Sequence, residues 1–277
     1  MTPAEAVLLG ILQGLTEPLP VSSSAHLVIV PALIQGFTQP TVFFDVVLHL
    51  GTLIAVICFL RREIAGLIAA LLPRAGRPGV TPLTNGGARA ADRRVILLII
   101  VATVLTGVIG LLFKDRIERL FESIETTACM LVITGVLLFL SDRVKTATRR
   151  KGEMNLVDGI VIGLVQAVAL IPGISRSGST ITFGIFRGIE RETAARFSFL
   201  LSIPAIAGAV VLKIAELEQI PSGELFALGA GFLSAAVTGF LALKLLFVMI
   251  NRTGLGVFAY YCWFAGAATL ILRGMQP

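Results

Sequence analysis

The sequence predicts an all-α integral membrane protein that forms a single membrane domain over residues 1–277. The composition is 56% hydrophobic and only 14% charged, and the mean hydropathy is +0.91. Six apolar stretches are long enough to cross a bilayer, and two serine-rich segments interrupt the chain. These observations together predict six transmembrane helices plus two re-entrant helix pairs in an inverted-topology repeat.

The re-entrant pairs are expected at about residues 3–38 and 155–187. Both regions are apolar, but Pro, Gly and Ser residues break them, so neither half of either region is long enough to cross comfortably. Irregular backbone at membrane depth is tolerated only where protein buries it or a water-filled cavity solvates it. Each region is therefore interpreted as a helix pair that enters and leaves by the same face.

The transmembrane helices are expected where uninterrupted apolar stretches approach the roughly 20 residues that a spanning helix needs. These stretches lie at about 41–60, 95–113, 124–140, 195–213, 226–248 and 254–272.

Loop charges predict the orientation of these helices. The loops 61–94, 142–152 and 187–196 are rich in Arg and Lys and are placed in the cytoplasm, whereas 214–225 has three Glu and no Lys or Arg and is placed outside. Both termini are then external. The same loop arginines explain the net charge of +6, and no basic stripe with interleaved aromatic residues supports nucleic-acid binding.

A fixed offset of 153 residues relates the two serine-rich segments. It predicts a first repeat over 1–141, with the cytoplasmic loop 61–94 as an insertion that is flexible over 73–91, and a second repeat over 155–277. Loops that correspond under the offset fall on opposite faces, so the halves are inverted and the site is expected near the midplane, where the breaks meet. The offset pairs Gly10 with Gly163, Gln13 with Gln166, Ser22 with Ser175 and Ser24 with Ser177.

The second serine-rich segment, Pro172–Thr180, combines Arg176 with four hydroxyl groups and two glycines just before an apolar stretch. Glycines allow close approach of backbone N–H groups, a helix N-terminus attracts anions, and Arg fits phosphate oxygens. The segment is therefore predicted to bind phosphate. The alternative for its serines is that small residues permit tight helix packing.

The first segment places Glu17 between apolar residues near a predicted re-entrant tip, where an unpaired carboxylate is costly. Three roles stay open for it: a divalent-metal ligand, a general base, or a structural partner of Arg176. Gln13 lies one helical turn earlier and is a further candidate metal ligand.

Further candidates follow Glu17 along the chain. His26 is a candidate for proton transfer, because histidine is the side chain best suited to it near neutral pH, although a lone histidine is more often a hydrogen-bonded core residue. Ser22, Ser23 and Ser24 are candidates for positioning phosphate, and one of them for a nucleophile. Asp45 and His49 form a second intramembrane pair, which either supports the site or is only structural.

These residues resemble the undecaprenyl-pyrophosphate phosphatase family, also called the bacitracin-resistance family, over essentially the whole chain. The first shared motif, Glu/Gln-x-x-x-Glu running into Pro-x-Ser-Ser-x-x-His, is met by Gln13–Glu17 and Pro20–His26. The second, Pro-Gly-x-Ser-Arg-Ser-Gly-x-Thr, is met by Pro172–Thr180. Gln13 stands where some relatives have glutamate, and Ala25 stands where glycine is commoner.

The resemblance implies an enzyme that hydrolyses undecaprenyl diphosphate to undecaprenyl phosphate and inorganic phosphate. This activity recycles the lipid carrier of peptidoglycan synthesis and confers bacitracin resistance. It further implies a divalent cation, Mg²⁺ or Ca²⁺, a multi-pass protein of the bacterial inner membrane with its site facing the periplasm or exterior, and a homodimer.

By resemblance, Glu17 is the catalytic carboxylate or metal ligand, His26 the general acid–base, and Arg176 the phosphate clamp. Ser23 is the candidate nucleophile, but the choice between a phosphoserine and direct attack by water stays open. Asp45, Gln13 and Gln166 are supporting residues. The phosphate-binding set comprises Ser22, Ser24, Ser175, Arg176, Ser177, Gly178 and Thr180.

The main rival function is a transporter that flips polyprenyl phosphate, because inverted repeats with paired breaks are also transporter architecture. Fold alone does not decide between them. The Glu, His, Arg and Ser groups exceed what anion binding requires and favour the enzyme. A scaffold protein has no need of charges near the midplane and is the weakest reading.

Overall fold

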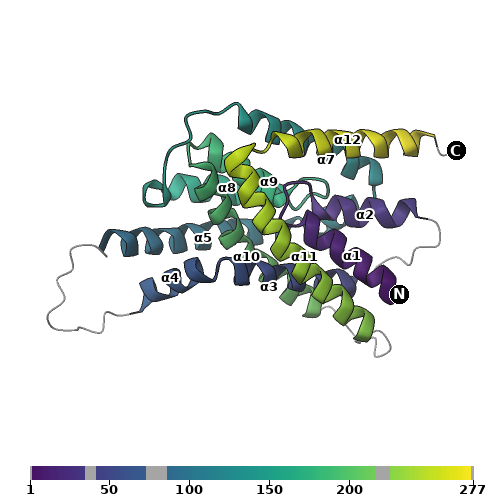
Figure 1. Ribbon diagram of the computed structural model, residues 1–277, viewed down its shortest axis with the longest axis horizontal. Helices are drawn as coiled ribbons and strands as arrows, with labels where there is room; N and C mark the ends of the chain where they lie inside the picture. The colour runs from purple at the N-terminus through teal and green to yellow at the C-terminus, as the bar shows by residue number, and fades with distance from the viewer. Residues whose placement is uncertain (1, 35–41, 73–85, 216–224, 276–277) are drawn as a thin grey trace.

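The computed structural model describes residues 2–34, 42–72, 86–215 and 225–275 (Figure 1). Within these ranges the regular structure is helical, and the only β-type pairing is an isolated bridge between Arg149 and Ile189. The elements in chain order are α1 (Pro3–Thr16), α2 (Ser23–Leu33), α3 (Val42–Phe59), α4 (Arg61–Leu71), α5 (Gly86–Leu112), α6 (Lys114–Leu120), α7 (Ile124–Asp142), the 3-10 helix η1 (Lys151–Glu153), α8 (Leu156–Val168), α9 (Arg176–Phe186), α10 (Arg191–Ala215), α11 (Leu225–Arg252) and α12 (Gly256–Gly274).

The predicted spans are present as the helices α3, α5, α7, α10, α11 and α12. Five of these are long and apolar enough to cross a membrane by themselves. The number is six if α3 and α4, which are bent by 74° at their junction, are counted as one broken span. The prediction of an all-α membrane protein is therefore confirmed.

Both broken regions form helix pairs separated by a short irregular segment. The breaks are residues 17–22, between α1 and α2, and residues 169–175, between α8 and α9. The longest of these four helices, α1, has 14 residues, so at 1.5 Å per residue none is longer than about 21 Å. That length is short of the roughly 30 Å hydrocarbon core, so no helix of either pair could cross alone.

Matching capping boxes begin the two pairs. Thr2 and Glu5 cap α1, and Asn155 and Asp158 cap α8. The Asp158 side chain is fully buried and also forms ion pairs with Arg149, at 2.7 Å, and with Arg187, at 2.9 Å. These contacts fix the start of α8 to the loops on either side of the second pair.

The region 61–94 differs from the predicted loop. It begins with α4, and α5 starts at Gly86, before the apolar stretch. Residues 73–85 of the predicted flexible insertion lie outside the described residues, but 86–91 form the first turns of α5. Four of these six residues are Ala or Arg, which favour helix, although the first two are Gly. Hydropathy alone therefore placed the start of the helix too late.

Small residues bring α1 against α11 and α8 against α5. A side chain at Gly10 would place its Cβ 2.0 Å from Ser234 Oγ and 2.4 Å from the Gly231 carbonyl oxygen. At Gly163 the Cβ would lie 2.6 Å from the Cα of Ala102. Small residues let membrane helices approach closely, and these contacts seat each broken pair against a spanning helix (Figure 1).

Helix boundaries and contacts follow the repeat pattern. The offset of 153 residues takes α2 onto α9, and an offset of 132 takes α7 onto α12. Thr106 on α5 donates to the Gly163 carbonyl at 3.1 Å, and Thr238, its counterpart 132 residues on, donates to the Gly10 carbonyl at 3.5 Å. These matches support the predicted repeats, whose inversion stays a prediction. The shorter offset shows that the extra residues of the first half lie between α3 and α5.

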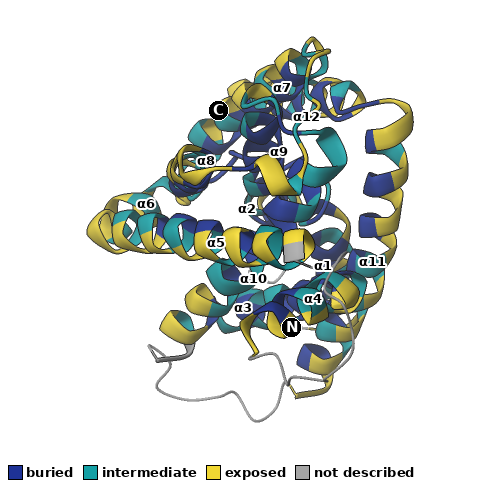
Figure 2. Cartoon of the chain, turned by 90° about the vertical axis from the view of Figure 1, so that its left-hand side faces the viewer, coloured by how far each residue is buried: buried dark blue, intermediate teal, exposed yellow. Residues whose placement is uncertain are grey.

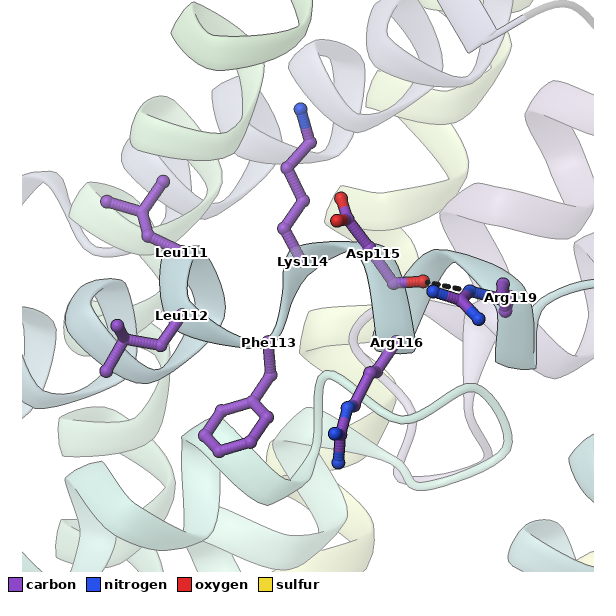
Figure 3. A pocket seen from close by; sticks show the side chains of 7 residues that line it. All are labelled: Leu111, Leu112, Phe113, Lys114, Asp115, Arg116 and Arg119. Carbon is purple, nitrogen blue, oxygen red and sulfur yellow. Dashed lines mark hydrogen bonds between the residues drawn. The ribbon is translucent and has the colours of Figure 1, made fainter.

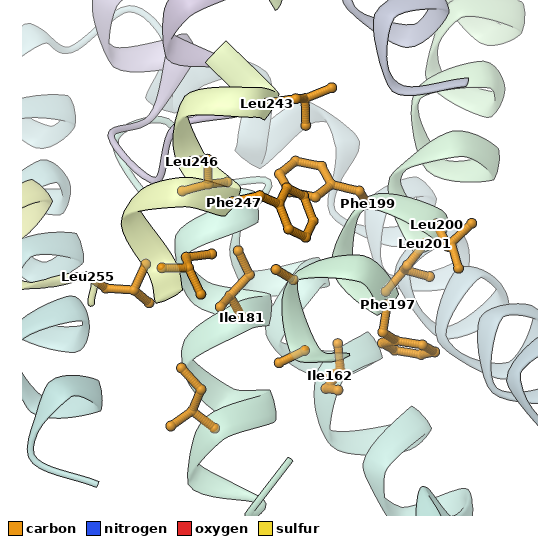
Figure 4. Close-up of a cluster of buried hydrophobic side chains, with 14 of the residues drawn as sticks. Ile162, Ile181, Phe197, Phe199, Leu200, Leu201, Leu243, Leu246, Phe247 and Leu255 are labelled. Atoms are coloured by element: carbon orange, nitrogen blue, oxygen red, sulfur yellow. The ribbon is translucent and has the colours of Figure 1, made fainter. Parts of the chain in front are cut away.

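A buried apolar cluster lies around α9 (Figure 4). Ile181 of α9 is fully buried, and Phe199 of α10 faces Phe247 of α11 with ring centroids 6.1 Å apart. In lipid, where the tails are as apolar as the side chains, such packing stabilises mainly through van der Waals contact. The cluster gives the second pair a rigid base.

Exposed residues lie along the outward faces of the helices (Figure 2), and many of them are large and apolar. On α5 the exposed positions recur every three or four residues, as one stripe of a helix. They are Leu97, Ile100, Val104, Val108 and Leu111. We assign this stripe to the lipid.

Candidate active site

The two breaks meet in the interior and contact each other directly. The Arg176 side chain, at the start of α9, reaches Glu17 in the first break. Ser177 donates to the carbonyl oxygen of Leu19 at 3.3 Å. A Cβ at Gly178 would lie 3.2 Å from that of Pro20, so glycine allows the first break to lie close against α9.

Glu17 is the centre of the polar cluster. Its Oε1 accepts a 2.5 Å hydrogen bond from Arg176 Nη2, and its Oε2 accepts from Ser23 Oγ at 2.5 Å and from Gln13 Nε2 at 3.2 Å. The side chains of Glu17 and Arg176 are only 9% and 16% exposed. Each charge of this ion pair therefore offsets the other, in an interior where a single buried charge is costly.

The pair from α3 lies beside this centre. His49 Nε2 is 3.8 Å from Glu17 Oε2, and its Nδ1 donates to the Asp45 carbonyl oxygen at 2.8 Å. The sequence left open whether this pair takes part, and the structure places His49 next to Glu17.

Three buried polar atoms of these residues have no hydrogen-bond partner within the described chain: Gln13 Oε1, Asp45 Oδ1 and Arg176 Nη1. Buried polar atoms are normally paired, so these unpaired ones are candidate contacts for a bound ligand. Two are oxygen acceptors suited to a cation, and the third is a donor suited to a phosphate oxygen.

Four of the remaining predicted serines lie at the starts of α2 and α9. Ser22 and Ser175 cap α2 and α9, where they accept from the backbone N–H groups of Ala25 at 3.4 Å and Gly178 at 3.0 Å. Ser24 bonds Ser22 at 3.1 Å, just as Ser177 bonds Ser175 at 3.3 Å. These four serines thus form matching pairs at the two helix starts, where backbone N–H groups favour an anion.

Two predicted residues face away from Glu17. Thr180 bonds Ser198 of α10 at 2.6 Å and its own helix at the Arg176 carbonyl, so its hydroxyl joins α9 to α10. Gln166 donates to Thr106 of α5 at 3.1 Å. The position equivalent to Glu17 in the second half is Leu170, so Gln166 has no carboxylate to bind.

His26 is anchored at both ring nitrogens. Nδ1 lies 2.8 Å from the Ser22 carbonyl oxygen, and Nε2 lies 2.6 Å from the hydroxyl of Tyr261 on α12. Ser22 has φ +66°, a conformation that is uncommon outside glycine, and its contact with His26 helps to hold it. Sequence analysis missed Tyr261, because it lies in an apolar stretch 235 residues away with no motif around it.

The oxygen donors around Glu17 decide whether the expected divalent cation fits this site. Among the described residues, no three His, Cys, Asp or Glu side chains lie close enough together to bind one metal ion. The oxygen atoms of Glu17, Gln13 and Asp45 nevertheless suit Mg²⁺ or Ca²⁺, which prefer oxygen ligands, and Mg²⁺ in particular usually keeps several waters. The unpaired oxygens of Gln13 and Asp45 are the observation that makes the donor set fit.

A cavity of about 180 Å³ lies elsewhere, at the junction of α5 and α6 (Figure 3). None of the predicted site residues lines it. Its walls are Leu111, Leu112, Phe113, Lys114, Asp115, Arg116 and Arg119.

Comparison with known proteins gives one consistent family. The model of the family described as "Bacitracin resistance protein BacA" matches residues 6–268 of the chain. Proteins named undecaprenyl-diphosphatase are similar over nearly their whole length. The one from Geobacter sulfurreducens is 45% identical over 96% of each chain, and the one from Moorella thermoacetica is 44% identical over 94% of each. The one from Methanobrevibacter smithii is 41% identical over 95% of this chain and 94% of its own.

Proposed function

Because the chain belongs to the bacitracin resistance protein BacA family, we propose that it hydrolyses undecaprenyl diphosphate to undecaprenyl phosphate and inorganic phosphate. The observation that carries this proposal is the contact of Glu17 with Ser23 of its own helix pair and with Arg176 of the other pair. It joins a phosphate-binding cation, a hydroxyl nucleophile and a proton acceptor in one buried cluster. The activity recycles the lipid carrier for cell-wall synthesis and raises resistance to bacitracin.

The geometry supports Ser23 as the nucleophile. Its hydroxyl already donates to Glu17 Oε2, so its lone pairs are free to attack the terminal phosphorus. A bond forms between Ser23 Oγ and phosphorus, the bond from phosphorus to the bridging oxygen breaks, and the hydroxyl proton passes to Glu17. Undecaprenyl phosphate leaves, and water then hydrolyses the phosphoserine. Arg176 binds the terminal phosphate and offsets its growing charge.

We assign Glu17, Gln13 and Asp45 to hold a divalent cation of the Mg²⁺ or Ca²⁺ type. Such a cation, when bound, neutralises phosphate charge and orients the diphosphate. His26 is assigned as the acid–base for the second stage. The loop charges support a site that opens to the outside of the inner membrane, and a homodimer stays the expectation for the assembly.

The test is phosphate release from a short-chain polyprenyl diphosphate by the purified protein in detergent, with Mg²⁺, with Ca²⁺ and with EDTA. We expect release with the cation and none in EDTA. Glu17→Ala should abolish release, whereas the matched control Glu122→Ala, an exposed glutamate between α6 and α7, should keep it. Absence of release from folded wild-type protein with either cation would refute the phosphatase and favour polyprenyl-phosphate transport.

A further inference from the structure

The hydrogen bonds of His26 define which nitrogen carries its proton. The Ser22 carbonyl oxygen can only accept, so Nδ1, 2.8 Å away, must be the donor. In the neutral ring Nε2 then has a lone pair and no hydrogen. The Tyr261 hydroxyl, 2.6 Å from Nε2, is therefore the donor to that lone pair.

The two rings also lie nearly parallel. The angle between the imidazole plane and the phenol plane is 10°, and the ring centroids are 5.7 Å apart. His26 is 7% exposed, and its ring cannot turn without losing both hydrogen bonds. The Ser22 carbonyl thus fixes the tautomer, and Tyr261 holds the ring in its orientation from the other side.

On the basis of the proposed function, in which His26 is the acid–base, we propose that Tyr261 is a positioning residue that acts on the reaction through His26. Among the described residues, the Tyr261 hydroxyl hydrogen-bonds the imidazole of His26 and forms no hydrogen bond with Glu17, Ser23 or Arg176. The neighbouring Cys262 is fully buried, and its thiol lies 3.7 Å from the Pro20 carbonyl oxygen. α12 therefore contacts the first helix pair at two successive residues, and the first of these, Tyr261, orients the proposed acid–base His26.

The chain offers a matched control, because its only other tyrosine is the adjacent Tyr260. Tyr260 is 62% exposed and packs against Phe139 and Trp263, away from His26. Tyr261→Phe and Tyr260→Phe each remove one hydroxyl from the same turn of the same helix. A difference between them therefore isolates the hydrogen bond to His26.

For Tyr261→Phe we expect kcat to fall about 10- to 100-fold, part of the roughly 10²- to 10⁴-fold that a general acid–base contributes. KM should stay close to that of wild type, because Tyr261 is not placed against the substrate, and the pH profile of kcat should shift. Tyr260→Phe should match wild type in kcat, in KM and in the pH profile of kcat. Wild-type kcat and pH profile in Tyr261→Phe would overturn the proposal.

A double-mutant cycle separates positioning through His26 from a general packing effect. Tyr261→Phe added to His26→Ala should cause no further loss of kcat, whereas an additional, independent loss would overturn the proposal.

Nitrogen-15 spectra of histidine-labelled protein give a readout that does not depend on activity, and they are simple because the chain has only two histidines. Tyr261→Phe should move the Nε2 signal of His26 and leave His49 in place; an unmoved signal would also overturn it.

The two proposals can fail separately. A wild-type protein that releases no phosphate would refute the phosphatase, and the nitrogen-15 comparison would still decide whether Tyr261 orients His26. An active wild type with an unaffected Tyr261→Phe variant would refute only the positioning role.

Discussion

Single residues in this site have more than one task, and Arg176 shows it most clearly. One guanidinium nitrogen, Nη2, binds Glu17, while Nη1 is buried without a partner in the described chain. A planar fork can hold a carboxylate on one side and a phosphate oxygen on the other. The residue therefore keeps Glu17 in place and still has a donor for the phosphate that we propose it binds.

This geometry predicts the effect of Arg176→Lys. An ammonium keeps the charge but lacks the fork, so it cannot keep Glu17 and add a second, fixed donor for phosphate. We expect kcat/KM for polyprenyl diphosphate to fall about 10²- to 10³-fold, the cost of one lost oxyanion donor. Arg116→Lys, on α6 and outside the site, is the control. Equal activity of the two variants in steady-state assays would contradict the assigned role.

The sequence predicted the types of residue in the site but not all of their contacts. Glu17 and Arg176 were found because charges within apolar segments are conspicuous. Their pairing across 159 residues was only one of three open roles, since it depends on how two breaks pack. Tyr261 was not predictable, because a tyrosine in a spanning helix gives no signal of which neighbour its hydroxyl reaches.

At the scale of helices, the glycines of α1 set how closely the first pair lies against α11. Gly10→Ala would push a methyl group into Ser234 and the Gly231 carbonyl. We expect a destabilisation of about 1–3 kcal/mol, as for overpacking of a close interface. Gly107→Ala on α5, where nothing lies within 4 Å, is the control. Thermal unfolding in detergent measures both, and equal midpoints would argue against tight seating of α1.

Helix positions were predicted well where hydropathy and breaks decide them, as for α3, α7 and both broken pairs. The sequence reading did not identify α4 and α6. α4 buries only Leu67 and Ala70 and carries charges at its start, and α6 is a short charged helix with no fully buried residue. Neither has the long apolar stretch that marks a span. Their formation depends on neighbouring helices rather than on hydropathy.

For the whole molecule, ion pairs join helix ends that the loop charges assign to one side. Lys213 binds Glu118 at 2.6 Å and Arg273 binds Glu125 at 3.0 Å, all at predicted external ends. At predicted cytoplasmic ends, ion pairs connect Arg196 with Glu63 and Lys151 with Asp92. The ion pairs thus join only helix ends that the loop charges place on the same side of the membrane.

This topology predicts the labelling of single cysteines. In a chain whose three native cysteines are replaced, Glu122→Cys should react with an impermeant maleimide added to intact cells, and Arg150→Cys should react only after the membrane is opened. Both positions are exposed, so access to the reagent decides the result. The reverse pattern would invert the whole molecule and move the site to the cytoplasmic face.

The matching positions of the two breaks carry different chemistry. The offset pairs Glu17 with Leu170, His26 with Ser179 and Arg176 with Ser23. A chain made of two identical copies of either half would retain the caps and the close helix contacts, yet it would hold carboxylates without a guanidinium, or the reverse. The proposed mechanism therefore requires the two halves to differ at these positions, because each half supplies a group that the other lacks.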